Sequence, residues 1–240
     1  MPLMRSVPPG RRMPPRSGGV VSILLAVSGA ALASPVEAQV PVPDVSRVMD
    51  YIDDLYRAQS SYSSMRMTVV RERGTRELEL EAWSKGDDET LIVIRSPARE
   101  AGTATLRTED GLWNYAPRAD RLIRIPTGLL SDSWMGSHFT NDDLMRETSY
   151  LDDYDAVLSL DDLAGVTYLK AILTPKPDAP VVYSEMVWYI TTEDWIPYRT
   201  EYYDDGNLIR SMTFERIETI SGKKIPMRMI IVPEDEPEER

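Results

Sequence analysis

The hydrophobic pattern of the chain changes from a helical period to a strand period near residue 64. Asp44 is a suitable helix cap, and the residues after it place apolar side chains on one helical stripe, namely Val45, Val48, Met49, Ile52, Leu55 and Tyr56. From Ser64 onward, apolar and polar residues mostly alternate, and turn residues separate the alternating segments. We therefore expect one helix followed by a meander of about ten or eleven antiparallel strands.

The alternation predicts which side chains share a face of the sheet. Met65, Met67 and Val69 alternate with polar residues, as Leu78 and Leu80 do in the next predicted strand. Residues 91–94 are apolar on both faces, which is typical of a strand covered on both sides, so their orientation stays open. The Asp-Gly turn at residues 204–207 is a strong hairpin signal.

The stretch of residues 131–144, which we call the central stretch, interrupts this series of strands. It contains the only histidine, His138, and it ends in a predicted short helix over residues 141–147, capped by Thr140 or Asn141. Its large apolar side chains are Trp134, Met135 and Phe139. Two interpretations stay open: these side chains fill an ordinary core, or the stretch is a functional lid.

Residues 1–38 have the three parts of a secretory signal peptide. A basic segment precedes the apolar run of residues 20–33, and residues 36–38 fit a cleavage site. The apolar run is shorter than the roughly 20 residues that a membrane-spanning helix needs. We expect a Sec-type signal that is removed after Ala38, and an exported protein without stable membrane insertion.

Charge and cysteine content narrow the possible partners. The full chain has 27 basic and 39 acidic residues, and loss of four arginines and one glutamate with the leader leaves 23 and 38, a net charge of −15. Such a charge disfavours nucleic acid as a partner. Without cysteine, stability must come from a buried core. We expect one domain over residues 39–232 and a mobile acidic tail over residues 233–240.

Candidate catalytic and metal-binding residues are few. A nucleophile and base pair would need a serine with His138, but Ser137 is its direct neighbour and no G-x-S-x-G motif is present. The acidic run at residues 151–155 lacks the glycine and the final glutamate of an EF-hand loop. We expect a protein that is not an enzyme and holds no metal or cofactor.

Methionines recur on one apparent face of the predicted sheet. Met65, Met67, Met186, Met212 and Met229 all occupy alternating apolar positions. Methionine adapts its shape to flexible apolar ligands, but plain core filling explains the pattern equally well.

Three segments resemble the outer-membrane lipoprotein-sorting proteins, relatives of the periplasmic lipoprotein carrier LolA. They read W-M-G-S-H-F-T-N-D-D-L at 134–144, T-T-E-D-W-I-P-Y-R-T-E-Y-Y-D-D-G-N-L at 191–208 and S-G-K-K-I-P-M-R-M at 221–229. The resemblance covers nearly the whole mature chain. It implies a mainly β fold in which a single curved antiparallel sheet forms an incomplete β-barrel, with helices covering its concave side and an apolar cavity that takes up acyl chains.

The resemblance also implies a function and its partners. We expect a monomeric periplasmic carrier or chaperone that binds acyl chains of lipoproteins or lipids, with an inner-membrane transporter as donor and an outer-membrane acceptor. The expected cavity residues are Met65, Met67, Val69, Leu78, Leu80, Leu106, Trp113, Met186, Trp188, Met212, Phe214 and Met229, with Trp134, Met135 and Phe139 as the lid. A lipid-responsive envelope-stress regulator and a non-lipid accessory subunit of an inner-membrane export system remain as alternatives.

Overall fold

The computed structural model describes residues 41–55, 59–86, 89–145, 149–179 and 181–240, and the expected signal peptide lies outside them. Within the described residues it has three α-helices, α1 (Val45–Asp54), α2 (Asn141–Met145) and α3 (Tyr150–Asp153), and two short 3-10 helices at Thr127–Leu129 and Trp134–Gly136. No helix of the described part is long and apolar enough to cross a membrane.

Twelve strands make up most of the described chain. In order they are β1 (Ser60–Arg71), β2 (Gly74–Lys85), β3 (Glu89–Ser96), β4 (Ala104–Thr108), β5 (Gly111–Ala116), β6 (Arg121–Arg124), β7 (Tyr154–Leu163), β8 (Val166–Pro175), β9 (Glu185–Thr191), β10 (Pro197–Asp204), β11 (Asn207–Ile220) and β12 (Lys223–Pro233). The predicted meander is thus confirmed, with slightly more strands than expected.

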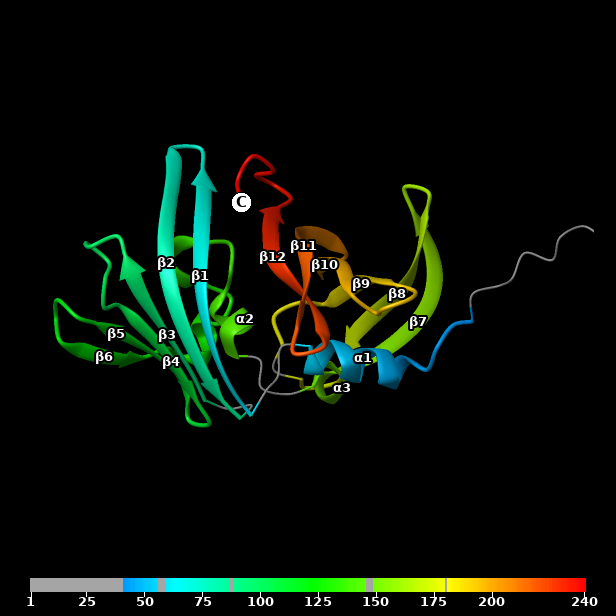
Figure 1. The fold of residues 1–240 in the computed structure, drawn as a ribbon, viewed down its shortest axis with the longest axis horizontal. Helices are drawn as coiled ribbons and strands as arrows, with labels where there is room; N and C mark the ends of the chain where they lie inside the picture. The colour runs from blue at the N-terminus through cyan, green and yellow to red at the C-terminus, as the bar shows by residue number, and fades with distance from the viewer. Residues whose placement is uncertain (1–40, 56–58, 87–88, 146–148, 180) are drawn as a thin grey trace, which may run out of the picture. The chain divides into compact units, whose positions relative to one another are not determined.

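The strands form two antiparallel sheets of six strands each, so the expected single continuous sheet is not confirmed (Figure 1). The first sheet has the order β1 to β6, and the second runs from β7 to β12. Every neighbour in sequence within a sheet is a neighbour in space. The division falls between β6 and β7, where the central stretch and two short helices replace strand hydrogen bonding. A long irregular connection therefore ends one meander and begins the other.

Strand register settles which side chains share a face of the first sheet. Met65 pairs with Leu80 and Met67 pairs with Leu78, so the face predicted from alternation is confirmed. Leu80 pairs with Ile94, which places Ile94 on the same face. We call this the inner face of the first sheet, and Ile92 shares it two residues along β3. Leu91 and Val93 therefore lie on the opposite, outer face.

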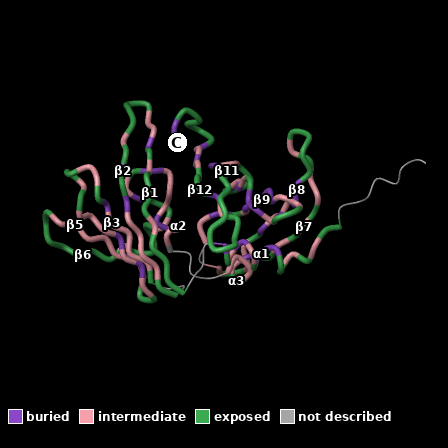
Figure 2. Tube along the Cα trace, viewed as in Figure 1, coloured by how far each residue is buried: buried purple, intermediate pink, exposed green. Residues whose placement is uncertain are grey.

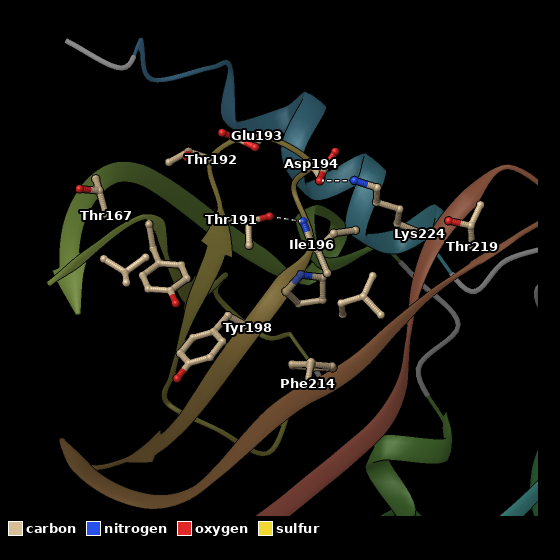
Figure 3. A pocket seen from close by; sticks show the side chains of 14 residues that line it. Thr167, Thr191, Thr192, Glu193, Asp194, Ile196, Tyr198, Phe214, Thr219 and Lys224 are labelled. Carbon is tan, nitrogen blue, oxygen red and sulfur yellow. Dashed lines mark hydrogen bonds and ion pairs between the residues drawn. The ribbon is translucent and has the colours of Figure 1, made fainter. Parts of the chain in front are cut away.

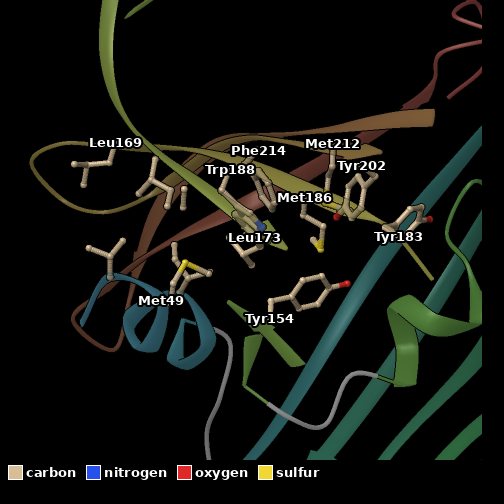
Figure 4. Close-up of a cluster of buried hydrophobic side chains, with 14 of the residues drawn as sticks. Met49, Tyr154, Leu169, Leu173, Tyr183, Met186, Trp188, Tyr202, Met212 and Phe214 are labelled. Carbon is tan, nitrogen blue, oxygen red and sulfur yellow. The ribbon is translucent and has the colours of Figure 1, made fainter. Parts of the chain in front are cut away.

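Helix α1 begins and packs as its sequence predicts. The Asp44 carboxylate accepts hydrogen bonds from the N–H groups of Ser46 and Arg47, at 3.0 Å and 3.3 Å. Val48, Met49 and Ile52 are buried against the second sheet, among residues of β8, β9 and β11 (Figure 4). Burying this apolar stripe, rather than helix propensity alone, holds a helix of ten residues in place.

Buried residues lie within the strands, whereas the hairpin ends are exposed (Figure 2). The larger core cluster belongs to the second sheet and its helices, and it includes Tyr154, Leu173, Met186, Trp188 and Phe214. A smaller cluster covers the inner face of the first sheet and consists of Leu78, Leu80, Ile94 and Trp134. Partly buried Phe139 packs against both clusters, so one side chain of the central stretch contacts both cores.

The acidic tail, which the sequence predicts to be mobile, contacts β1 in the structure. Val70 and Arg240 exchange two backbone hydrogen bonds, at 2.6 Å and 3.2 Å. The side chain of Glu239 is buried, forms an ion pair with Arg71 and accepts the N–H of Glu72 at 3.1 Å. The end of the described chain is therefore held by backbone and charged contacts.

Candidate functional site

The central stretch folds into a compact turn whose hydrogen bonds are largely local. The Trp134 carbonyl accepts both the N–H and the hydroxyl of Ser137, at 2.9 Å and 2.7 Å, and the Phe139 carbonyl accepts the N–H of Trp134 at 2.6 Å. Met135 and Gly136 have φ angles of 51° and 66°. This left-handed backbone is costly for methionine and free for glycine.

A reciprocal cap starts the helix at the end of the stretch. The Thr140 hydroxyl accepts the N–H of Asp143 at 3.2 Å, and the Asp143 carboxylate accepts the N–H of Thr140 at 2.7 Å. Of the two capping residues expected from sequence, the structure therefore selects Thr140.

Three arginines from three strands donate hydrogen bonds to carbonyl groups of the central stretch. Arg76 of β2 donates to the Met135 carbonyl, and Arg71 of β1 donates to the Gly136 carbonyl at 3.2 Å. Arg210 of β11 donates to the His138 carbonyl at 2.7 Å. Because the arginines come from both sheets, the stretch is held by both. The sequence shows these arginines only as polar positions within alternating strands, so their role could not be predicted.

Arg210 is the most deeply buried of these cations. Its guanidinium forms two hydrogen bonds with the Asp143 carboxylate, at 2.9 Å and 2.6 Å, and lies over the rings of Tyr183 and Tyr202, at 5.0 Å and 4.3 Å from their centroids. Burial alone would lower the pKa of Arg210, but the bonds and charge of Asp143 outweigh burial and raise it. Desolvation also raises the pKa of Tyr183 and Tyr202. Arg210 therefore stays charged, and the two tyrosines stay neutral.

Trp134 inserts its side chain into the inner face of the first sheet. It is only 5% exposed and contacts the cluster of Leu78, Leu80 and Ile94. Its indole Nε1 donates to the Thr105 hydroxyl of β4 at 3.0 Å, which satisfies the one polar atom of the buried ring. Met135 and Phe139 pack around the same cluster. The expected lid residues thus lie together on an apolar sheet face.

The residues expected to line one cavity are divided among several environments. Val69, Leu78 and Leu80 are buried on the first sheet, and Met67 packs beside them. The core of the second sheet contains Met186, Trp188, Met212 and Phe214. Two predicted cavity residues on the edge strands β1 and β12 are exposed, Met65 at 38% and Met229 at 41%.

Leu106 and Trp113 do not share a face with Leu80, which corrects the predicted cavity. Ile92 of the inner face pairs with Thr105, so the next residue, Leu106, points to the outer face. Trp113 pairs with Leu106 and lies there too. The error arose because the alternation of β4 and β5 does not by itself say which of the two faces is buried.

His138 lies next to charged groups of the tail and of the first sheet. Its Nε2 is 3.3 Å from a carboxylate oxygen of Glu239, which in turn binds Arg71. Desolvation and then the charge of Arg71 lower the pKa of His138 below its ordinary value of 6.5, while Glu239 acts in the opposite direction. Through His138 the acidic tail contacts the central stretch.

Among the buried polar atoms of the second sheet that have no hydrogen-bond partner in the described part of the chain, two belong to the neighbouring strands β9 and β10. They are the indole Nε1 of Trp188 and the hydroxyl oxygen of Thr200, which occupy paired positions on β9 and β10. Both residues are buried, with Thr200 fully so. Unsatisfied donors inside a core cost free energy, so they are rare without a reason.

A surface groove that sequence reasoning missed lies at the end of the second sheet (Figure 3). Its volume is about 600 Å³, and the stacked rings of Tyr168 and Tyr198 form one side of it. The loop that joins β9 to β10 forms its rim, where Lys224 and Asp194 make an ion pair of 2.6 Å. Phe214 is the one predicted cavity residue that lines it. Loop contacts build this groove, and strand alternation does not encode them.

Comparison with known proteins places the chain in a family. A family model described as "Uncharacterized protein" matches residues 86–240. The chain is similar to the crystal structure of a DUF1329 family protein from Desulfovibrio piger, with 26% identity and a TM-score of 0.72 over 80% of this chain and 85% of that one. No curated protein matches the chain.

Two further solved structures share the fold. A LolA superfamily protein from Nitrosomonas europaea has 23% identity and a TM-score of 0.65, over 81% of this chain and 87% of that one. A proposed outer membrane lipoprotein-sorting protein domain from Vibrio parahaemolyticus has 19% identity and a TM-score of 0.67, over 80% and 87%. The chain therefore belongs to the family that the matching model describes, which is of the DUF1329 type, and its fold is that of the LolA-like lipoprotein-sorting proteins.

Proposed function

We propose that the protein is a periplasmic carrier that takes up the acyl chains of a lipoprotein or lipid and hands them on toward the outer membrane. The observation that carries the proposal is the position of the central stretch. Trp134 and Phe139 cover apolar sheet faces, while polar bonds from three arginines hold their backbone. Moving one short segment would therefore uncover two apolar surfaces without unfolding either sheet.

Energetics favour a carrier whose own side chains compete with its cargo. Burying an acyl chain yields about 0.8 kcal/mol per CH₂, so a chain of about sixteen carbons contributes on the order of 12 kcal/mol. Release from such a site would be slow. Return of Trp134 and Phe139 to the uncovered faces lowers the net gain and makes handover feasible.

Two buried polar atoms also suit an acylated cargo. The Trp188 indole and the Thr200 hydroxyl can each donate to a carbonyl oxygen, and the ester and amide links of an acylated cysteine supply such oxygens. We infer that these groups bind a carbonyl oxygen of an acyl chain held against the second sheet. Substituting Trp188→Phe with Thr200→Val should weaken binding of an ester-linked lipid and leave binding of a plain alkane unchanged.

The wider proposal follows the relatives that share this fold. It places the mature protein in the periplasm after Sec-type export, as a monomer without enzymatic activity, between an inner-membrane donor and an outer-membrane acceptor. The relative from Vibrio parahaemolyticus is described as an outer membrane lipoprotein-sorting domain, which supports a lipoprotein or lipid cargo.

The test combines Trp134→Ala with Phe139→Ala. With the competing side chains removed, we expect uptake of a palmitoylated fluorescent peptide to be faster and its release to acceptor vesicles to be slower. Trp113→Ala, on the outer face, is the matched control and should change neither rate. If uptake and release keep their rates in the double variant, the central stretch is not a lid, while the proposed carrier function is not affected.

Native mass spectrometry of protein purified from its exporting host separates the carrier from the other classes. Bound lipid or acylated peptide supports the carrier. A clean mass with no uptake of acyl chains would instead favour an accessory subunit or a regulator.

A further inference from the structure

The exposed edges of the two sheets differ in their protection against pairing with another strand. Among the described residues the sheets end at β1, β6, β7 and β12. Proteins usually protect such edges with short strands, charged side chains or proline. β6 has only four residues, with an arginine at each end. β7 has three charged residues, Asp155, Asp161 and Asp162. β12 has three charged residues and a proline, namely Lys223, Lys224, Arg228 and Pro226.

β1 lacks this protection over most of its length. Residues 60–68 read S-S-Y-S-S-M-R-M-T, with Arg66 as the one charged residue and no proline. All of them except Ser63 and Met67 are exposed. Four serines leave the backbone accessible because their side chains are short. β1 is therefore a long edge that is open to another extended chain.

The direction of the free hydrogen-bonding groups follows from the contact between β1 and the tail. Val70 directs its N–H and C=O away from β2, because both are bonded to Arg240. The pairing of β1 with β2 has no register shift, so every second residue has the same direction. The residues that direct their backbone groups away from β2 are thus Tyr62, Ser64, Arg66 and Thr68, and within the described ranges no backbone partner bonds to them on that side.

We propose that residues 60–68 of β1 bind, as an added antiparallel strand, the extended polar segment that follows the acylated N-terminus of a lipoprotein cargo. This inference rests on the proposed carrier function. The pairing of Val70 with Arg240 is continuous with the proposed interface, because an added strand would extend the same row of hydrogen bonds.

The position of β1 supports this occupant over other peptides. Met65 and Met67 lie beside Leu80 and Leu78 on the inner face, so an acyl chain on that face would leave the sheet at the β1 edge. The peptide attached to the chain would then lie along residues 60–68. Binding through main-chain groups depends little on sequence, which suits a carrier of several different cargoes.

The experiment compares two probes on the same full mature chain. One is palmitoylated cysteine amide, and the other is a palmitoylated cysteine followed by about ten serine, glycine and asparagine residues, enough to cover the open edge. We expect the peptide probe to bind at least about tenfold more tightly, because several added hydrogen bonds each contribute modestly. Hydrogen exchange at the amides of Ser64, Arg66 and Thr68 should slow only with the peptide probe.

A proline variant tests the edge itself. Arg66→Pro removes one outward N–H and leaves the bonds between β1 and β2 in place, whereas Arg66→Thr keeps that N–H and is the matched control. We expect Arg66→Pro to lose most of the tenfold difference while it binds palmitoylated cysteine amide normally. The exchange measurement on the unchanged protein gives an answer even if the proline variant does not fold.

The remaining outcomes overturn the inference in distinguishable ways. Equal affinity for both probes, with no slowed hydrogen exchange at β1, would contradict peptide binding at the β1 edge, while the proposed carrier function would still hold. If the protein binds neither probe, both the carrier function and peptide binding at the β1 edge are contradicted. Sedimentation that shows a dimer paired through β1, which the peptide probe does not dissociate, would assign the edge to a second copy of the chain.

Discussion

At the scale of single residues, Arg210 has the largest expected effect on stability. Its guanidinium is enclosed by two tyrosine rings and binds both the Asp143 carboxylate and the His138 carbonyl. Replacing Arg210 with methionine would leave the Asp143 carboxylate, which is only 15% exposed, without its charged partner, and breaking a buried pair in this way typically costs about 3–5 kcal/mol. We expect this loss in the free energy of unfolding measured with urea.

Two further variants identify the cause of that loss. Adding Asp143→Leu to Arg210→Met should recover much of the stability, because no buried charge then remains unpaired. Arg66→Met removes an exposed arginine whose ion pair with Glu79 is open to solvent, and it should cost less than about 1 kcal/mol. Equal losses for Arg210→Met and Arg66→Met would contradict the importance of the buried pair.

His138 gives the protein a specific dependence on pH. Desolvation and the charge of Arg71 lower its pKa in the folded state below 6.5, so the unfolded chain binds the proton more readily. The contribution of His138 to stability is therefore complete above about pH 6.5 and is lost as the pH falls toward the folded-state pKa. Glu239 and Arg210 also face this ring, and Glu239 opposes the shift.

The check is a comparison with His138→Gln. Between about pH 7 and pH 5 the natural chain should lose more unfolding free energy than the variant, with the difference arising below pH 6.5. NMR titration of the single histidine gives its pKa directly. Parallel stability curves for the two proteins, or a pKa above 6.5, would contradict this assignment.

At the scale of elements, the central stretch depends on a left-handed turn. Gly136 has a φ of 66°, and its carbonyl is bound by Arg71. An added Cβ would meet only the end of the Arg76 side chain at 3.9 Å, so strain of the backbone and not crowding is the expected cost. Gly136→Ala should therefore destabilise the protein by roughly 1–2 kcal/mol.

A second glycine of the same connection serves as the control for this element. Gly128 has no atom within 4 Å of an added Cβ and no left-handed φ, so Gly128→Ala should be close to neutral. Under the carrier proposal, Gly136→Ala should also make acyl uptake faster, because it favours release of the stretch. A neutral Gly136→Ala would show that the turn does not hold the stretch in place.

At the scale of the whole described chain, the tail contacts elements that are distant in sequence. Glu239 binds Arg71 and the N–H of Glu72 on the first sheet and lies beside His138. Glu239→Gln should weaken these contacts and speed hydrogen exchange at the amides of Val70 and Glu72. Glu238→Gln changes an exposed neighbour and should leave exchange unchanged. Similar exchange in both variants would mean that the tail contact is not specific.

The sequence predicted most of the elements and one sheet face correctly. Asp44 and the apolar stripe after it predicted α1, the Asp-Gly turn predicted the hairpin of β10 and β11, and alternation predicted that Met65 and Leu80 share a face. It also marked the central stretch as an interruption of the strands and left open whether its aromatic residues form core or a lid. These features are local, because period, capping and turn chemistry depend on neighbours a few residues apart.

Only the tertiary structure decided how these elements combine. The division into two sheets, the outer position of Leu106 and Trp113, and the contact of Glu239 with β1 all depend on residues far apart in sequence. So does the binding of three carbonyl groups of the central stretch by Arg71, Arg76 and Arg210. An alternating pattern shows that the two faces differ, but tertiary packing decides which face is covered and which arginine binds which carbonyl group.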